Sequence, residues 1–100
     1  MNEDKVVSAM DNLLCRKWTL RLLMNLQANS PRRFNEISND LSGISSKTLS
    51  KRLKTLKAKS IIKRKSYSEI PPRVEYSLTE KGEKLIKSFD DVMKWAENWM

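Results

Sequence analysis

The sequence contains no histidine, one cysteine (Cys15) and two glycines, Gly43 and Gly82. Without histidine the chain lacks the most common general base and the most common nitrogen ligand of zinc. One cysteine supplies neither an internal disulfide nor a thiolate cluster, and two isolated glycines are too few for a phosphate-binding loop. These absences predict a binding protein that is not an enzyme and that holds no metal or other cofactor.

Long apolar runs are also missing, and so is a signal-peptide pattern at the amino terminus. No stretch approaches the roughly 18 apolar residues that a membrane-spanning helix requires. Met1 is followed by polar and acidic residues instead of an apolar segment. A single free cysteine fits a reducing compartment. The sequence therefore predicts a cytoplasmic protein that does not bind a membrane.

The composition is that of a small globular protein, with 39% apolar and 32% charged residues in a chain of 100. We expect one domain that spans residues 1–100. The core of so short a chain is small relative to its surface, so dimerisation would add stability.

The charges are unevenly distributed along the chain. Residues 41–68 hold nine of the 20 Lys and Arg residues and none of the 12 Asp and Glu residues. The remaining residues carry 11 basic and 12 acidic side chains, so this one segment accounts for the net charge of +8. A segment with charge of one sign attracts a polyanion. This pattern favours nucleic-acid binding over the alternative, an ordinary solvated basic surface.

Apolar periodicity, capping residues and prolines predict a mainly α-helical chain with one small β-hairpin. The expected elements, in order, are helices 3–14 and 17–27 with a break near Cys15 and Arg16, a short helix 36–41 capped by Asn35 and stopped by Gly43, a basic helix 45–59 capped by Ser45, strands 61–67 and 73–78, and one long helix capped by Thr79. A short helix, a turn and a basic helix form a helix-turn-helix, and a hairpin directly after it forms a wing. The predicted fold is therefore a winged helix-turn-helix. Residues 32–34 are expected to pair at the edge of the hairpin.

The basic helix has the two faces that a DNA recognition helix needs. Leu49, Leu53 and Leu56 follow at steps of four and three, which places them on one apolar face. The major groove of B-DNA admits a helix whose outer face carries cationic and hydroxyl groups. The side chains of this helix that are predicted to contact DNA are Ser46, Lys47, Thr48, Ser50, Lys51, Lys54 and Thr55. The alternative is that the lysines only solvate an exposed face.

Further cations outside this helix are predicted to bind the DNA backbone or the minor groove. They are Arg32 and Arg33 before the short helix and Arg64, Lys65 and Arg73 in the hairpin. Arg73 has an alternative role, because Glu69 and Glu75 lie close enough in the sequence to pair with it.

Several sequence blocks support this interpretation. They are KWTL at 17–20, RFNEI at 33–37, ISSKTLSKRLKTL at 44–56 and PPRVEYSLTEKG at 71–82. Together they resemble the HxlR-type transcriptional regulators over about residues 6–99. The resemblance implies a dimeric, MarR-like winged-helix protein that binds DNA and regulates transcription, with dimer contacts from its amino- and carboxy-terminal helices.

The terminal segments carry apolar side chains that suit such a dimer. Trp95 and Trp99 give the last helix more apolar surface than the outside of a small monomer needs, unless both pack internally against Trp18 and Leu22. The residues predicted to form the dimer interface are Val6, Met10, Leu13, Phe89, Val92, Trp95, Ala96 and Trp99.

Two positions depart from the family pattern. Many members carry a cysteine near the position of Lys5, where some sense electrophiles or oxidants, whereas the cysteine here is Cys15. We expect a buried, unreactive thiol at this position; the alternative is a reactive thiol beside Arg16 and Lys17. A glycine that is common before the wing is replaced by Ser60.

The first functional hypothesis is a regulator that binds a pseudo-palindromic operator as a dimer. The alternatives are a non-specific architectural or RNA-binding protein and a protein-interaction module that uses the tryptophan-bearing helix. The hydroxyl groups of the basic helix favour the first, because phosphate binding alone needs only charge. The regulated genes, the direction of regulation and any small-molecule effector stay open. By resemblance, an effector would bind between the terminal helices and the DNA-binding lobes.

Overall fold

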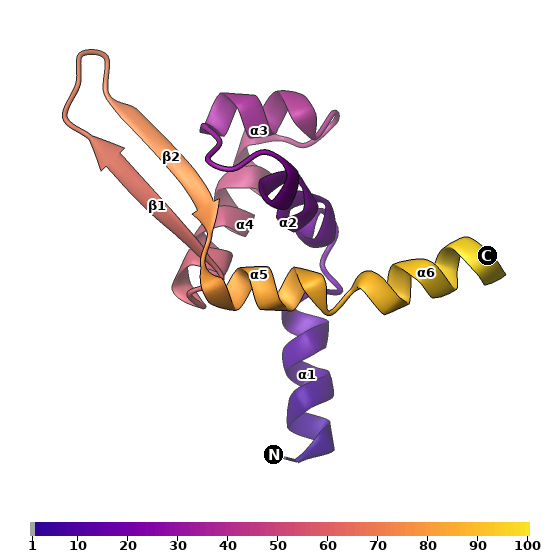
Figure 1. Cartoon of the computed structure of the whole chain (residues 1–100). Coiled ribbons are helices and arrows are strands. Elements are labelled where there is room, and N and C mark those ends of the chain that lie inside the picture. Colours follow the sequence, from indigo (N-terminus) through magenta and orange to yellow (C-terminus); the bar gives the residue numbers. More distant parts are fainter. Residues whose placement is uncertain (1) are drawn as a thin grey trace.

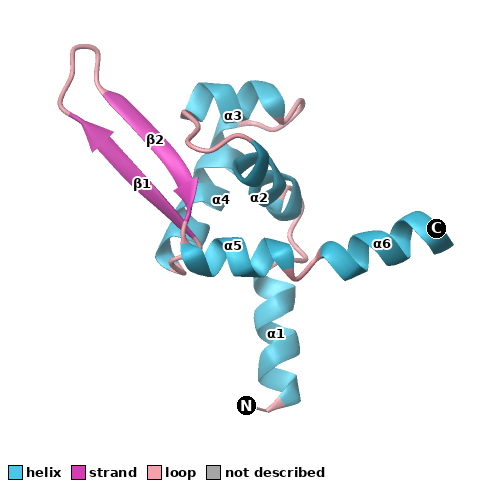
Figure 2. Ribbon diagram, in the orientation of Figure 1, coloured by secondary structure: helices cyan, strands magenta, loops and turns pink. Residues whose placement is uncertain are grey.

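The computed structural model describes residues 2–100 and shows six helices and one two-stranded antiparallel sheet in that range (Figure 1). In chain order the elements are α1 (Glu3–Leu13), α2 (Thr19–Ala28), α3 (Phe34–Asp40), α4 (Ser46–Ala58), β1 (Ile62–Tyr67), β2 (Arg73–Leu78), α5 (Glu80–Lys87) and α6 (Asp90–Trp99). Helices α2 to α5 pack together, and the hairpin, α1 and α6 each project from them (Figures 1 and 2). Because α3 and α4 are followed by β1 and β2, the predicted winged helix-turn-helix is confirmed.

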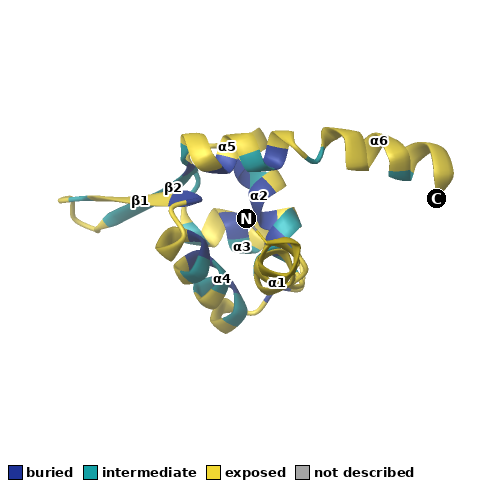
Figure 3. Ribbon diagram, turned by 90° about the horizontal axis from the view of Figure 1, so that it is seen from below, coloured by how far each residue is buried: buried dark blue, intermediate teal, exposed yellow. Residues whose placement is uncertain are grey.

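The core lies where α2 to α5 meet the base of the hairpin. Leu22, Leu23 and Leu26 of α2 are completely buried there, and burying one such side chain is worth roughly 1.5–3 kcal/mol. The buried side chains that they pack with are Ile37, Leu41, Ile44, Leu49, Leu53, Leu56, Ile61, Ile62, Leu78 and Ile86. In the view from below, buried residues line the inner sides of these elements, whereas α1 and α6 are exposed over most of their surface (Figure 3).

The chain breaks between α1 and α2 near Cys15 and Arg16, as predicted, but α2 begins at Thr19 and not at Lys17. The reason is Trp18, whose φ of 80° is a left-handed backbone conformation that a bulky residue rarely adopts. Its ring packs against the core and lies beside Gly43, where an added Cβ would be 3.8 Å from Cη2 of the ring. This packing holds the backbone of Trp18 in a conformation that an isolated chain would avoid.

The helix-turn-helix differs from the prediction at its first helix. The predicted cap at Asn35 is wrong, because α3 begins at Phe34 and Asn35 lies within it. Glu36 Oε1 instead accepts a hydrogen bond of 2.9 Å from the backbone N–H of Arg33, which ties the first turn to the preceding residue. After α3 ends at Asp40, Gly43 takes a φ of 94° in the turn, a conformation that favours glycine.

The predicted single carboxy-terminal helix is in fact two helices. Helix α5 ends at Lys87 and α6 begins at Asp90. At the junction the N–H of Ser88 is shared between the carbonyls of Lys84 and Leu85, both at 3.1 Å, and the Ser88 hydroxyl donates to the Lys84 carbonyl at 2.8 Å. A backbone hydrogen bond to the carbonyl three residues earlier tightens the helix locally, and a serine hydroxyl that donates to the carbonyl four residues earlier often bends it. The junction lets α6 leave the body of the molecule at its own angle (Figure 1).

The hairpin has a regular register that runs from Ile62 opposite Leu78 to Tyr67 opposite Arg73. The prediction that residues 32–34 pair at its edge is confirmed at Arg32. The Arg32 N–H donates to the Tyr76 carbonyl at 2.9 Å, and the Tyr76 N–H donates to the Arg32 carbonyl at 2.8 Å. Because Ile62 and Leu78 are buried, this register is fixed at the base of the wing and leaves the tip free in solvent.

The carbonyl group of Ile61 joins the base of the wing to the start of α5. It accepts hydrogen bonds of 3.0 Å from both the backbone N–H and the hydroxyl of Thr79, the cap of α5. Just before it, Ser60 has a φ of 60°, a left-handed backbone conformation that favours glycine. On the other side lies Gly82, which is buried; a Cβ at this position would clash with the carbonyl oxygen of Ile61 and stand only 3.2 Å from Leu78 Cδ2.

We predict that Gly82→Ala lowers the free energy of unfolding by about 1–3 kcal/mol, although alanine favours a helix by up to ~1 kcal/mol. The added Cβ forces α5 away from the backbone of Ile61. Urea unfolding followed by circular dichroism measures the change. The control is Glu83→Ala at the next, exposed position, with a change within about 0.5 kcal/mol. A Gly82→Ala protein as stable as wild type would contradict the close approach.

Candidate nucleic-acid interface

Helix α4 has one side fixed in the core and one side free. Leu49, Leu53 and Leu56 are buried, so the predicted apolar face is confirmed. The predicted cap is also present, since Ser45 Oγ accepts the Thr48 backbone N–H at 3.1 Å. Buried leucines and a capped first turn hold the opposite face of the helix in a fixed orientation toward solvent.

The outer face of α4 carries the side chains that the sequence predicted to bind DNA. Its exposed members are Ser46, Lys47, Lys51 and Lys54, and its half-buried members are Thr48, Ser50 and Thr55. Two of the hydroxyl groups are engaged within the protein. Ser45 donates to Thr48 Oγ1 at 2.9 Å, and Thr55 donates to the Lys51 carbonyl at 3.0 Å. The hydroxyl hydrogen of Thr55 is therefore used in a hydrogen bond within α4, although the sequence predicted that it would donate to DNA.

The cations of this segment are free of acidic partners. The ion pairs found within residues 2–100 join Arg32 to Glu36 and Asp40, Arg73 to Glu69, and Lys84 to Glu80. None involves a basic residue between positions 41 and 68, so the nine positive charges of that segment are uncompensated by contact. The structure thus preserves the charge separation seen in the sequence.

The two faces of the wing carry different cations. Arg64 is paired with Tyr76 across the strands, whereas Lys65 faces Glu75, so the side chains of Arg64 and Lys65 point to opposite faces. Arg64 lies on the same face as the buried Ile62, toward α4, and donates to Ser66 Oγ at 3.0 Å. The structure therefore groups Arg64 with the recognition helix and separates Lys65 from it.

On the opposite face Tyr67 is flanked by two cations. Lys65 Nζ is 5.0 Å and the Arg73 guanidinium carbon 3.8 Å from the centre of the Tyr67 ring. Arg73 also pairs with Glu69 at 3.2 Å, which is the alternative that the sequence left open. Arg73 thus stiffens the wing tip and is less available to DNA than Lys65.

Arg32 and Arg33 were both predicted to bind phosphate, and the structure separates them. The Arg32 guanidinium is part of a network in which its Nε donates to Asp40 Oδ2 at 3.1 Å and its Nη1 pairs with Glu36 at 3.2 Å. Arg32 therefore links the edge of the hairpin to α3 and is not a free cation. Arg33 is exposed next to the start of α3.

One basic residue of segment 41–68 that was not among the predicted DNA contacts anchors α4 from its side. Arg52 is half-buried, and its Nε donates to the Lys17 carbonyl at 3.0 Å. This bond connects the recognition helix to the segment between α1 and α2. Its position between the apolar and the outer faces of α4 was the only signal in the sequence.

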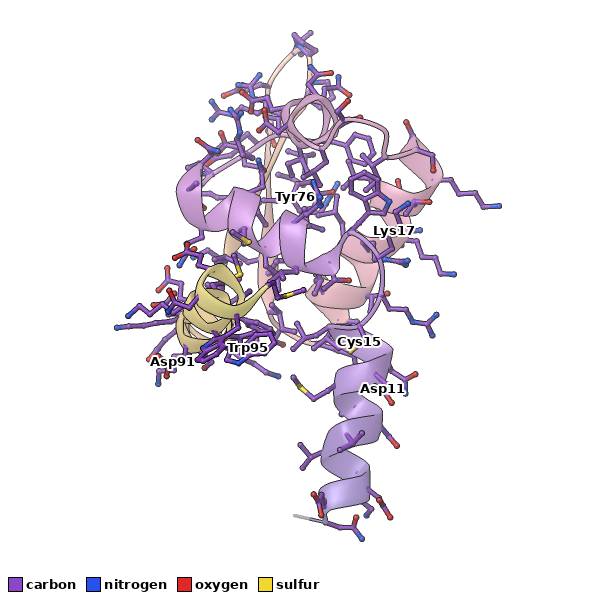
Figure 4. The ribbon with its side chains drawn as sticks, turned by 90° about the vertical axis from the view of Figure 1, so that its right-hand side faces the viewer. Asp11, Cys15, Lys17, Tyr76, Asp91 and Trp95 are labelled. Carbon is purple, nitrogen blue, oxygen red and sulfur yellow. The ribbon has the colours of Figure 1, made fainter. Side chains whose placement is uncertain are left out.

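The terminal helices expose the apolar side chains that were predicted to form a dimer interface. Val6, Met10, Val92, Trp95 and Trp99 are exposed, and Leu13, Phe89 and Ala96 are half-buried. The exposed fractions of Trp95 and Trp99 are 57% and 77%, so the alternative of internal packing against Trp18 and Leu22 does not hold. Figure 4 shows Trp95 on the outside of α6.

The expectation of a buried thiol at Cys15 is wrong. Cys15 is a free, exposed cysteine (Figure 4). It lies in the turn after α1, a helix without buried residues, and before the chain enters the core at Thr19.

Within residues 2–100 no helix is both long enough and apolar enough to cross a membrane. The same range contains no group of three His, Cys, Asp or Glu side chains placed to hold a metal ion.

Residues 13–100 match the family model described as HxlR-like helix-turn-helix. The chain belongs to this family. An uncharacterised HTH-type transcriptional regulator of Halalkalibacterium halodurans is 38% identical over 85% of this chain and 75% of its own length. The HTH-type transcriptional regulator YodB of Bacillus subtilis is 36% identical over 88% of this chain and 78% of its length.

Solved structures of such proteins have the same fold. The reduced form of YodB from B. subtilis has a TM-score of 0.85 with 36% identity, covering 99% of this chain and 95% of that one. A transcriptional regulator of the MarR family from Enterococcus faecalis V583 has a TM-score of 0.87 with 28% identity, covering 99% and 89% of the two chains. This HxlR-like protein is thus a MarR-like winged-helix regulator of transcription that binds DNA sequence-specifically. The non-specific architectural alternative is not favoured.

The Arg32 network of this HxlR-like protein gives a prediction about pH. Hydrogen bonds from Asn25 Nδ2, at 3.0 Å, and from Arg32 hold the pKa of Asp40 below its ordinary value of 3.8. A lowered pKa in the folded state means that ionised Asp40 stabilises the fold above the unfolded pKa, and that this contribution is lost as pH falls through the folded pKa.

We therefore predict that Asp40→Asn reduces stability at pH 7, and that the difference from wild type shrinks as the pH falls below about 4. Urea unfolding between pH 3 and pH 7 measures this difference. Asp11→Asn is the control, because the structure gives Asp11 no ion pair or side-chain hydrogen bond to any of residues 2–100. A pH-independent difference for Asp40→Asn would contradict the prediction.

Proposed function

We propose that the protein acts as a dimer on a pseudo-palindromic operator, with α4 of each subunit in the major groove and the wing at the adjacent backbone and minor groove. The observation that carries this proposal is the outer face of α4, which is cationic and hydroxyl-bearing and has no acidic partner among residues 2–100. Its helix is held by buried leucines, so little conformational order remains to be gained on binding.

The position of each side chain suggests its role. Lys47 and Lys51 lie one turn apart on the exposed face and would donate to guanine N7 and O6. Ser46, Ser50 and Thr48 lie close to the start of the helix, which reaches deepest into the groove. The proposed phosphate and minor-groove contacts, which position the helix without reading bases, are Arg33, Lys54, Arg64, Lys65 and, at the tip, Arg73. Thr55 is left out of this set because its hydroxyl donates to the Lys51 carbonyl. Arg32 is left out of this set because Glu36 and Asp40 occupy its guanidinium.

The proposed dimer is formed by α1 and α6. The exposed fractions of Trp95 and Trp99 on α6 are among the largest of the apolar residues. Burying a tryptophan covers about 150–250 Å², worth roughly 4–6 kcal/mol as an upper estimate. Two-fold symmetry of such a dimer would place the two α4 helices about one turn of DNA apart, so half-sites 10–10.5 base pairs apart are expected.

The remaining parts of the proposal follow from DNA as the partner. Residues 1–100 act as one DNA-binding domain without enzymatic chemistry, and the protein works in the cytoplasm, where the bacterial or archaeal chromosome lies. Repression or activation would then depend on where the operator lies relative to the promoter.

Selection of bound duplexes from a random library tests the proposal as a whole. We expect a palindromic consensus bound at least ~10³-fold more tightly than scrambled duplex. Equal affinity for every duplex, or tighter binding to RNA, would contradict a sequence-specific regulator.

We predict that Lys47→Ala and Lys51→Ala each weaken binding to the selected operator by about 5- to 100-fold, and that each relaxes the preference for one base pair. Fluorescence anisotropy with the operator and with single-base variants measures both effects. Lys87→Ala removes an exposed lysine from α5 as a matched control and should leave affinity unchanged. If both lysine variants weakened all duplexes equally, these side chains would be phosphate contacts.

We also predict that the double variant Trp95→Asp, Trp99→Asp is monomeric under conditions in which the wild-type protein is a dimer. Two carboxylates would have to be buried without partners in the proposed interface. Sedimentation equilibrium measures the mass, and circular dichroism verifies folding, since no residue of α6 is buried in the core. Ile70→Asp is the control, because Ile70 is a fully exposed apolar residue at the wing tip. A double variant that is still dimeric would place the interface elsewhere.

A further inference from the structure

A cavity lies between α4 and the base of the wing. Its volume is about 380 Å³, which falls within the range of small-molecule sites, roughly 300–1,000 Å³. The buried Leu53 of α4 forms its floor, and the half-buried rings of Phe34 from α3 and Tyr76 from β2 form its walls. Figure 2 shows the three elements that contribute these side chains around one end of the hairpin.

The mouth of the cavity carries positive charge only. Lys54 and Lys57 of α4 and Arg64 of β1 line it, and all three are exposed. No Asp or Glu lines the cavity, and none of the three cations forms an ion pair in the part of the chain that the structure describes. Three like charges around one opening repel each other unless an anion binds between them.

The side chains that line the cavity indicate which kind of ligand it can bind. Aromatic walls and an apolar floor suit a planar ring, which stacks on or packs edge-on against other rings. Three cations suit a dianion better than a monoanion, and a phosphate monoester carries about −1.5 to −2 charge at pH 7. The hydroxyl of Ser50, which also lines the cavity, adds a neutral hydrogen-bond donor.

We propose that this cavity binds a small aromatic phosphate monoester, with the ring between Phe34 and Tyr76 and the phosphate at Lys54, Lys57 and Arg64. The regulatory consequence rests on the proposed function, because Lys54 and Arg64 are also proposed DNA contacts. A ligand at this position occupies both cations and adds negative charge where a DNA phosphate would lie. Ligand and DNA therefore compete.

Calorimetric titration of the wild-type protein without DNA tests the site directly. Phenyl phosphate is expected to bind with a dissociation constant of about 4 mM or tighter, given about −0.3 kcal/mol or better for each of its roughly 11 non-hydrogen atoms. Inorganic phosphate, which lacks the ring, and phenol, which lacks the charge, should each bind at least about ten-fold more weakly. Equal binding of phenyl phosphate and inorganic phosphate would overturn the proposal, because it would mean general attraction of anions to a basic protein.

A matched pair of variants locates the binding. Lys57→Gln removes a cavity cation that is not a proposed DNA contact and should weaken phenyl phosphate binding about five-fold. Lys63→Gln removes the same charge from β1, next to Arg64 in sequence but on the other face of the hairpin, and should leave binding unchanged. An equal loss in both variants, or no loss in either, would contradict the assignment to this cavity.

Competition with DNA is measured separately, by fluorescence anisotropy with a duplex that the protein binds. Phenyl phosphate at ten times its dissociation constant should weaken DNA binding by about ten-fold in the wild-type protein and by only about three-fold in Lys57→Gln. DNA binding that phenyl phosphate does not change would overturn the competition. Failure of the proposed function would give a different result. The protein would then bind no duplex specifically, but calorimetry would still detect the binding of phenyl phosphate.

Discussion

The burial of the leucine face of α4 is the interaction on which the rest of the structure depends. Leu49, Leu53 and Leu56 are almost completely inaccessible to solvent, and they share their core with the three buried leucines of α2. Because an α-helix has one fixed rotation per residue, burying this stripe also decides which side chains face outward. The cationic and hydroxyl groups of α4 thus gain a defined direction without making any contact of their own. A helix with the same outer residues and a weaker apolar face would present them in many orientations.

The acidic residues are also distributed unevenly over the structure. Carboxylates are used where a cation needs fixing, as Glu36 and Asp40 fix Arg32 and Glu69 fixes Arg73. They are absent from the segment that is proposed to meet DNA. Surface ion pairs contribute little to stability, typically 0–1 kcal/mol, so leaving the cations of α4 without partners costs the fold little. It does preserve their full attraction for phosphate, which falls with salt because counterions are displaced from the DNA.

Features set by a few neighbouring residues were predictable from the sequence, and features set by tertiary packing were not. The caps Ser45 and Thr79, the leucine stripe of α4 and the two strands depend on local spacing, and all agree with the structure. The bend at Ser88 depends on a shared backbone hydrogen bond, which no residue pattern in the sequence predicts. The left-handed backbone of Trp18 depends on the packing of its ring beside Gly43. The same distinction applies to the candidate interface. Exposure of the α4 cations followed from periodicity, whereas the commitment of Arg32 to α3 and the exposure of Cys15 required the folded chain.

The register of the wing decides which of its cations works with α4. Successive side chains of a strand point to opposite faces, so a shift of one residue would exchange the two faces completely. In the observed register Ile62 is buried and Arg64, two residues later, faces α4 and the cavity. A shifted strand would bury Lys63 and turn Lys65 toward the helix, which the cost of burying an unpaired ammonium forbids. The backbone bonds between Arg32 and Tyr76 hold the second strand in place from its other edge. Core packing at one end of the hairpin therefore determines that Arg64, and not Lys63 or Lys65, lies at the mouth of the cavity. Leu53 is the only one of the buried core residues that lines this cavity.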